Sequence, residues 1–194
     1  MRLPGSARER ALLGPVLALA AVCLLDAVHF ARHWPVPVAG LLDEPAHLLT
    51  TWLIGTAAAG PRLRATWTRM LPWALAGSVV IDLDHLPVYL WSAPIALPGS
   101  RPVTHSLAAV AVLLAVAAAT RRRVRTAALG LAVGVTLHLV RDVATGPGIP
   151  LLWPVDPSDV QLPYGIYLAA LVVAAAVAAR RPRGRAPVSA CGAR

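Results

Sequence analysis

The sequence predicts an all-α, polytopic membrane protein with about six transmembrane helices. Hydrophobic residues make up 57% of the 194 residues and the mean hydropathy is +0.65, which is too apolar for an ordinary soluble domain of this length. These residues fall into six stretches of about 17–21 residues, close to the length that a helix needs to cross a bilayer. The stretches are 11–31, 43–60, 71–91, 103–120, 126–144 and 164–180.

We expect residues 1–180 to form one helical domain without internal repeats. The first stretch follows three arginines, as in a signal peptide, but its apolar run continues to Ala31, which favours an uncleaved span. The fourth and sixth stretches are runs of Ala, Val and Leu, whereas the second and third carry polar clusters. Residues 181–194 are rich in Arg, Pro, Gly and Ala, which predicts a disordered tail.

The distribution of arginine predicts the topology. All 18 basic residues are Arg, and with the N-terminus in the cytoplasm only Arg32, Arg101 and Arg141 fall on the outer side. Both termini are then cytoplasmic. This bias explains the basic runs as topology signals that touch anionic lipid headgroups, so we expect membrane lipid as a partner and no nucleic acid. Cys23 and Cys191 lie too far apart in the sequence to indicate a disulfide framework.

The same topology gathers the polar clusters at the outer face. An Asp or Arg at the centre of a span costs roughly 2.5–3.5 kcal/mol, so such residues usually pair, line a wet cavity or bind a metal. His and Asp are good ligands for divalent metals. We therefore expect a metal site at the extracytoplasmic end of the bundle, built from the clusters Asp26–His29, Asp43–His47, Asp82–His85, Arg101–His105 and His138–Asp142.

Two of these clusters have the spacing of paired ligands. His138 and Asp142 are i, i+4 and share a helix face, which suits either two metal ligands or a His–Asp hydrogen bond between packed helices. Asp82 and His85 are i, i+3. Asp84 points elsewhere on an ideal helix, but Pro87 loosens the backbone here and lets it turn in. Carboxylates near a helix C-terminus are disfavoured, so this cluster favours a cation.

The cluster Arg101–His105, before the fourth stretch, contains one candidate metal ligand and one candidate anion-binding residue. His105 is a candidate ligand, and Thr104 suits a helix cap beside it. The planar fork of Arg101 suits a phosphate, although an interfacial anchor is an equal alternative. Ser106 lacks a GxSxG context, which argues against a serine hydrolase.

The remaining clusters contribute further ligands or their hydrogen-bond partners. We expect His47 to be a ligand, with Asp43 and Glu44 either supporting the ligands or capping the helix. Asp26 and His29 either hydrogen-bond a metal-bound histidine or ligate directly. The segment 143–163 is long enough to cover the site as a lid, or it simply connects two spans.

The order of these motifs resembles the YdjM-like family, described as inner-membrane-associated, metal-dependent hydrolases. The resemblance extends over about residues 43–156 and rests on His47, the Asp-Leu-Asp-His at 82–85, the Arg-x-x-Thr-His-Ser at 101–106, and the segment 138–154. The family looks related to zinc-dependent phospholipase C and the single-strand-specific zinc nucleases. The resemblance implies a bacterial inner membrane location and phosphoester hydrolysis by metal-activated water.

Two patterns depart from what such families show. Family members often have His-Arg-Gly before Thr-His-Ser, whereas this chain has Ser100-Arg101-Pro102-Val103, which puts the number of metals in question. Type-2 phosphatidic-acid phosphatases share an Arg-Pro and a His-x-x-x-Asp with this chain. Their Ser-Gly-His is absent and Ala132 replaces their second arginine, so their metal-free phosphohistidine mechanism is not expected.

The sequence thus predicts a membrane hydrolase of a lipid or amphiphilic phosphoester that uses Zn²⁺, with Mn²⁺ as the alternative. Asp84 is the candidate base and Arg101 the candidate phosphate binder. The alternative is a non-enzymatic metal-binding protein or a metal or proton carrier, which would need polar residues toward the cytoplasmic face. The expected metal ligands are His47, Asp82, Asp84, His85, His105, His138 and Asp142.

Overall fold

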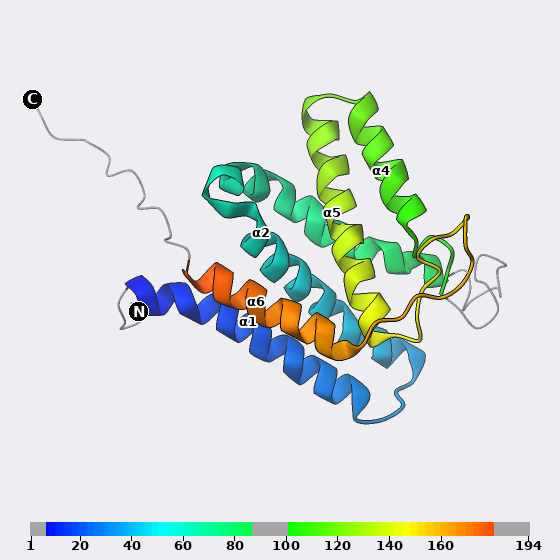
Figure 1. The fold of residues 1–194 in the computed structure, drawn as a ribbon, viewed down its shortest axis with the longest axis horizontal. Helices are drawn as coiled ribbons and strands as arrows, with labels where there is room; N and C mark the ends of the chain where they lie inside the picture. The colour runs from blue at the N-terminus through cyan, green and yellow to red at the C-terminus, as the bar shows by residue number, and fades with distance from the viewer. Residues whose placement is uncertain (1–6, 87–100, 181–194) are drawn as a thin grey trace, which may run out of the picture.

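The structure is a computed structural model that describes residues 7–86 and 101–180. Within these ranges the chain is helical and contains no β-strand, which confirms the all-α prediction. The elements are α1 (Ala7–Phe30), α2 (Val36–Val80), the 3-10 helix η1 (Ile81–Asp84), α4 (Leu107–Ala119), α5 (Arg122–Thr145) and α6 (Tyr164–Arg180) (Figure 1). The predicted tail at 181–194 lies outside the described residues.

The second and third predicted stretches lie in the two limbs of α2, which meet at a sharp kink where the second stretch is predicted to end. Gly60 has φ 54° and ψ 173°, a conformation that glycine adopts without penalty, and it breaks α2 into two limbs. Pro61 begins the second limb, where its fixed φ suits a first helical turn. The two limbs pack together because Gly55 leaves room for the ring of Trp67, whose Nε1 donates to Thr56 Oγ1 at 3.2 Å.

Three helix ends differ from the prediction. α2 begins at Val36 rather than near residue 43, so Asp43 lies in its second turn and cannot cap it. Ser106 is the extended residue before α4, so Thr104 is not the cap of that helix. The third stretch is α-helical only to Val80 and then tightens into η1, while its predicted residues 87–91 lie outside the described residues.

Close packing between the second limb of α2 and α5 sets the position of the candidate ligands. A Cβ on Gly130 would meet Trp73, a Cβ on Gly134 would strike the Ala74 carbonyl, and a Cβ on Gly77 would lie 2.6 Å from the Leu131 carbonyl oxygen. Small residues four apart allow such backbone contact between membrane helices. The contact continues along α5 toward its C-terminal end, where the predicted ligands lie.

The helices α1 and α6 run antiparallel and cover the first limb of α2 (Figure 1). Their shared core contains Val22 from α1, Leu53 from α2, and Tyr167 and Leu171 from α6, all of which are buried. Burial of these apolar side chains holds the N- and C-terminal helices against the part of α2 that bears the His47 cluster.

Two of the described helical stretches, Leu12–Phe30 and Arg122–Thr145, are long and apolar enough to cross a membrane. The apolar stretches of α4 and α6 are shorter. Large apolar side chains are exposed along α1, α4 and α6, among them Leu24, Val112 and Val173. Extended exposed apolar surface is typical of contact with lipid or a partner. Six membrane spans with both termini cytoplasmic stay a prediction.

Candidate metal centre

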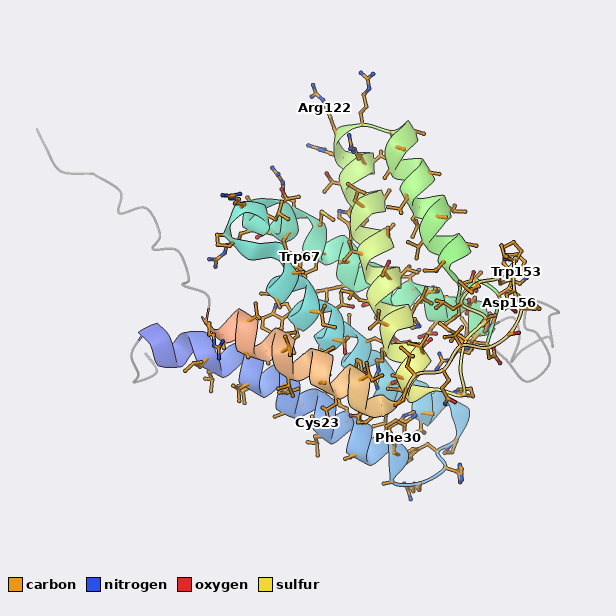
Figure 2. The ribbon with its side chains drawn as sticks, in the orientation of Figure 1. Cys23, Phe30, Trp67, Arg122, Trp153 and Asp156 are labelled. Atoms are coloured by element: carbon orange, nitrogen blue, oxygen red, sulfur yellow. The ribbon has the colours of Figure 1, made fainter. Side chains whose placement is uncertain are left out.

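The predicted His and Asp ligands come together from four parts of the chain. The first turns of α2, the start of α4 and the C-terminal end of α5 lie on the same side of the molecule (Figure 1). Arg122 lies at the opposite end of α5, away from Trp153 and Asp156 of the loop before α6 (Figure 2). The topology therefore places the polar clusters side by side, as the sequence predicts.

One group of donors is built on η1 and the segment before α4. His85 Nδ1 lies 2.9 Å from Asp84 Oδ1 and 3.3 Å from Asp82 Oδ1. His105 approaches both carboxylates, with Nε2 3.0 Å from Asp82 Oδ1 and Nδ1 3.2 Å from Asp84 Oδ2. Thr104 donates a hydrogen bond to Asp84. The tight 3-10 geometry brings Asp82 and Asp84 to the same histidine, which an ideal α-helix would not do.

A second group is built on α2 and α5. His138 Nε2 lies 3.0 Å from Asp142 Oδ2, and His47 Nε2 lies 3.5 Å from Asp142 Oδ1. The rings of His47 and His138 stack with centroids 3.9 Å apart. The Ser78 carbonyl lies 2.9 Å from His138 Nδ1, so Nδ1–H donates to it and Nε2 is presented to the cluster. A backbone bond of this kind typically orients a metal-binding histidine.

Several buried atoms that could ligate a metal make no hydrogen bond within the described part of the chain. They include His138 Nε2, both carboxylate oxygens of Asp142 and Oδ1 of Asp84. Buried polar groups are normally satisfied because an unpaired one costs about 1–3 kcal/mol. His138 and Asp142 are completely buried. These atoms lie at ion-pair distance from one another, from His85 and from Arg101, and a cation among them would suit a His and Asp set.

The spacing of the donors fits a metal ion. In four overlapping groups, one donor atom from each residue lies within 4.8 Å of the others. Their carboxylates, on Asp43, Asp82, Asp84 and Asp142, outnumber the two arginines beside them, Arg101 and Arg141. Excess buried negative charge favours a cation. The groups are Asp82, Asp84, His85 and His105; His47, Asp82 and His138; His105, His138 and Asp142; and Asp43, His47 and Asp142.

The candidate phosphate binder lies at the edge of these groups. Arg101 Nη1 is 2.9 Å from Asp142 Oδ2 and 3.9 Å from Asp82 Oδ1. The neighbouring Gly146 permits this approach, since a Cβ there would lie 3.0 Å from the Arg101 guanidinium. Arg101 is thus beside the candidate ligands rather than at a distant interface.

Arg141 connects the cluster to three other helices. It is buried, and its guanidinium bonds Asp26 on α1 at 2.6 Å and Asp43 on α2 at 2.5 Å. It also donates to Tyr167 of α6 at 3.0 Å. Asp43 Oδ2 in turn lies 3.3 Å from His47 Nε2. The contacts Arg141–Asp43–His47 therefore hold one candidate ligand in place, as the supporting role expected of Asp43 would require.

Two expected supporting residues lie elsewhere. Asp26 bonds Arg141 and accepts a hydrogen bond from Tyr164 at 2.8 Å, so within the described contacts both of its oxygens serve residues other than histidine. His29 packs edge-on against Phe30, with ring centroids 5.4 Å apart, outside the donor groups. Asp26 thus reaches the centre only through Arg141.

The loop between α5 and α6 is held against the helices that bear the site. Leu107 N–H donates to the Leu151 carbonyl at 2.9 Å, and Leu162 N–H donates to the Val143 carbonyl at 2.6 Å. Ile149 and Val160 form an antiparallel bridge across the loop. These bonds keep residues 146–163 beside the start of α4, consistent with a covering role.

Sequence reasoning did not assign Arg141, Ser78, Tyr164 or Tyr167 to the site. Arg141 had a visible signal, because it is a charged residue within an apolar stretch, next to a predicted ligand. The two tyrosines are i, i+3 at the start of the last apolar stretch, which is a weaker signal. Ser78 contributes only its backbone carbonyl, so its side chain carried no information.

An apolar helical bundle with a buried His and Asp donor set at one end defines a helical membrane protein with a candidate metal centre. The chain belongs to the YdjM inner membrane protein family, whose sequence model matches residues 42–193.

Among curated proteins, the chain is 36% identical over 99 residues to inner membrane protein YdjM of Escherichia coli (strain K12) and of Shigella flexneri. The match covers 45% of this chain and 50% of each relative, so the chain spans about half the length of the curated relatives it matches. No solved structure matches the chain significantly.

Proposed function

We propose that the protein is a membrane-bound, metal-dependent hydrolase of a lipid or amphiphilic phosphoester at the extracytoplasmic interface. The observation that supports this most directly is the convergence of buried His and Asp donors, several without a hydrogen-bond partner in the described residues. Zn²⁺ is the metal that such a donor set favours, with Mn²⁺ as the alternative.

The metal, when bound, supplies an activated water and polarises a phosphoryl oxygen. His47, Asp82, His85, His105, His138 and Asp142 would hold it, while Ser78 and Asp43 orient His138 and His47. Asp84 is held by Thr104 close to His105, a position in which its carboxylate can ligate or accept a proton. Arg101 binds the phosphate through its planar fork.

A lipid-borne substrate is favoured by the surroundings of the site. The helices that build it expose apolar side chains along their length, and the candidate ligands lie near helix ends. A phosphoester attached to a lipid would present its headgroup at this depth. A soluble substrate would not require an apolar helical bundle around the site.

The competing proposal is a metal or proton carrier. A carrier needs polar groups that continue through the bundle. The buried side chains beyond the cluster are largely apolar, among them Leu53, Ala74, Ala132 and Val135. This composition favours a site that is open to one face only.

The test is phosphate or headgroup release by the purified full chain in native lipid, over a panel of phospholipids and isoprenoid phosphates. Release should stop on chelation and return with Zn²⁺ or Mn²⁺. Asp84→Ala should lower turnover more than metal content if Asp84 is the base, while Asp156→Asn, an exposed loop position, should change neither. A metal-loaded protein without chelator-sensitive release would overturn the hydrolase assignment and favour the carrier.

Arg101→Lys offers a sharper test of phosphate binding. A lysine keeps the positive charge but replaces a bidentate fork with a point charge. We expect turnover to fall by about tenfold or more, since hydrogen bonds to charged groups contribute about 1.5–3 kcal/mol. If Arg101→Lys kept full activity and an unchanged metal content, Arg101 would not bind phosphate through its fork and would be an interfacial anchor instead.

A further inference from the structure

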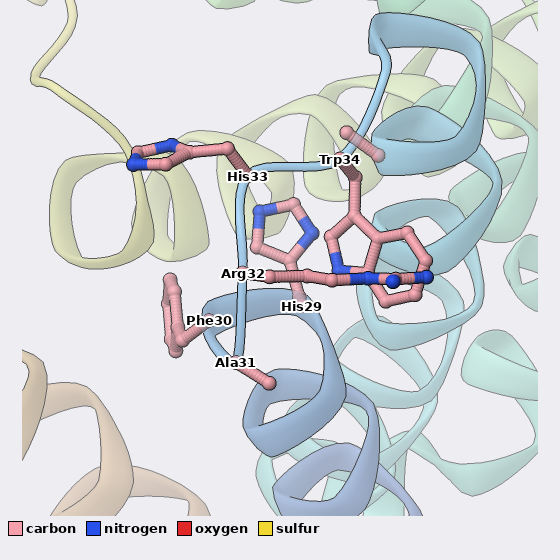
Figure 3. Close-up of a pocket in the computed structure, with 7 residues that line it drawn as sticks. His29, Phe30, Ala31, Arg32, His33 and Trp34 are labelled. Atoms are coloured by element: carbon pink, nitrogen blue, oxygen red, sulfur yellow. The ribbon is translucent and has the colours of Figure 1, made fainter.

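A second candidate site lies where α1 ends and the chain turns toward α2. The last turn of α1 and the connection line an open cleft of about 520 Å³. Its lining includes His29, Arg32, His33 and Trp34, and no carboxylate is among the lining residues (Figure 3). None of these residues belongs to the His and Asp groups of the candidate metal centre. The cleft therefore shares no residue with the candidate metal centre. Its basic lining without a carboxylate suits an anion.

The arrangement of Trp34 and Arg32 is built from several bonds. Trp34 Nε1 donates to the Val28 carbonyl at 2.9 Å, one of the carbonyls that the end of a helix leaves without an intrahelical partner. This bond holds the indole ring as a platform. The central carbon of the Arg32 guanidinium lies 3.7 Å from the ring centroid, in a cation–π contact (Figure 3). Stacking uses the face of the guanidinium and leaves the N–H donors at its edge available.

Two polar groups at this cleft, on His29 and Arg32, have no hydrogen-bond or ion-pair partner among the described residues. Arg32 forms no ion pair there, unlike Arg101 and Arg141, which face carboxylates. His29 Nδ1 is buried and makes no hydrogen bond within the described part of the chain. His29, Arg32 and Trp34 point to one side of the connection, whereas Phe30 and His33 point to the other (Figure 3). An anion on the first side would lie beside the Arg32 guanidinium and the His29 ring.

The position of the cleft relative to the membrane indicates where its anion comes from. The stretch Leu12–Phe30 is long and apolar enough to cross a membrane, and Arg32 follows it by two residues. Arg and Trp just beyond a span lie at the level of the lipid headgroups. We propose that His29, Arg32 and Trp34 bind the phosphate of an anionic membrane lipid. This lipid site does not require the metal centre or its activity.

The proposal is tested with the full chain in detergent, by titration with dioctanoyl-phosphatidylglycerol, dioctanoyl-phosphatidylcholine or inorganic phosphate. The wild type should bind the anionic lipid more tightly than the zwitterionic one, and both more tightly than free phosphate. Arg32→Gln should weaken binding of the anionic lipid by about tenfold or more, because it removes a charge-assisted hydrogen bond. Arg32→Lys should weaken it less, since the charge remains but the stacked fork is lost.

Two further variants separate a specific site from general attraction. Arg123→Gln removes the same charge from an exposed basic run on α5, so it reports general electrostatic attraction and should weaken lipid binding far less than Arg32→Gln. Trp34→Phe keeps an aromatic face but loses the bond to Val28, and should give an intermediate loss. Thermal unfolding confirms that each variant is folded. An Arg32→Gln protein that is folded and binds the anionic lipid as wild type would overturn the proposal. The proposal would also be overturned if inorganic phosphate bound as tightly as the lipid, because the cleft would then be a site for free phosphate.

Discussion

His138 and Asp142 lie one turn apart on α5, with His138 Nε2 3.0 Å from Asp142 Oδ2. Asp142 Oδ2 also lies 2.9 Å from Arg101 Nη1, and His138 is oriented from behind by the Ser78 carbonyl. A histidine whose other nitrogen is already held by a backbone carbonyl, and which faces a buried carboxylate, has the arrangement typical of a metal-binding histidine. Metal ligation by this pair stays a prediction beside the hydrogen-bond interpretation of the i, i+4 spacing.

The first prediction follows from this pair. The purified protein should retain at least about one divalent ion per chain, and His138→Ala and Asp82→Ala should each lose most of it, because removing a ligand or its support typically costs 10–100-fold in affinity. Elemental analysis of the detergent-purified protein measures this directly. His33→Ala, an exposed histidine outside the donor groups, is the matched control. Full metal retention in both ligand variants would contradict the metal centre.

The second prediction concerns Arg141. Its removal leaves Asp26 and Asp43 buried without their cation, so Arg141→Ala should be destabilised by about 3–5 kcal/mol. Arg141→Lys should be intermediate, because an ammonium group lacks the fork that joins two carboxylates and a tyrosine. Thermal unfolding in detergent gives the comparison, with Arg123→Ala on the same helix as the control. An unchanged melting temperature in Arg141→Ala would show that the network does not hold the helices together.

The third prediction tests the packing that positions α5. Gly134→Ala places a methyl group against the Ala74 carbonyl, where backbone rather than a flexible side chain blocks it. We expect a loss of about 1–3 kcal/mol from overpacking, and weaker metal retention because His138 lies one turn further along. Gly165→Ala is the control, since a Cβ there meets nothing within 4 Å and alanine is the better helix former. Equal stability of the two variants would contradict the close approach of α2 and α5.

The fourth prediction is the membrane topology. Reporter fusions after Arg64 and Arg123 should report a cytoplasmic location, and a fusion after Asp159 a periplasmic one. The reason is the arginine bias, which places nearly all basic residues on the side opposite the polar clusters. A periplasmic signal at Arg123 would invert α5 and place the His and Asp cluster on the cytoplasmic side.

The sequence by itself determined the helical class and the chemistry of the site. Long apolar stretches can satisfy their backbone in a membrane only as helices, and this holds whatever their neighbours are. The spacing of His138 and Asp142 places both on one helix face, and repeated His and Asp at helix ends indicate a metal. These inferences depend on local geometry and residue type alone, which the sequence contains in full.

Only the tertiary structure decided how those residues meet. The positive φ at Gly60 turns the chain sharply between two predicted spans, and the 3-10 turn of η1 brings Asp84 beside Asp82. The contacts of Arg141 with Asp26 and Asp43 join residues 115 and 98 positions apart in the chain. No local pattern encodes such pairs, because they result from how tightly α2 packs on α5 and how α1 and α6 close over them. Packing therefore selects which of the polar residues become candidate ligands and which hold those candidates in place.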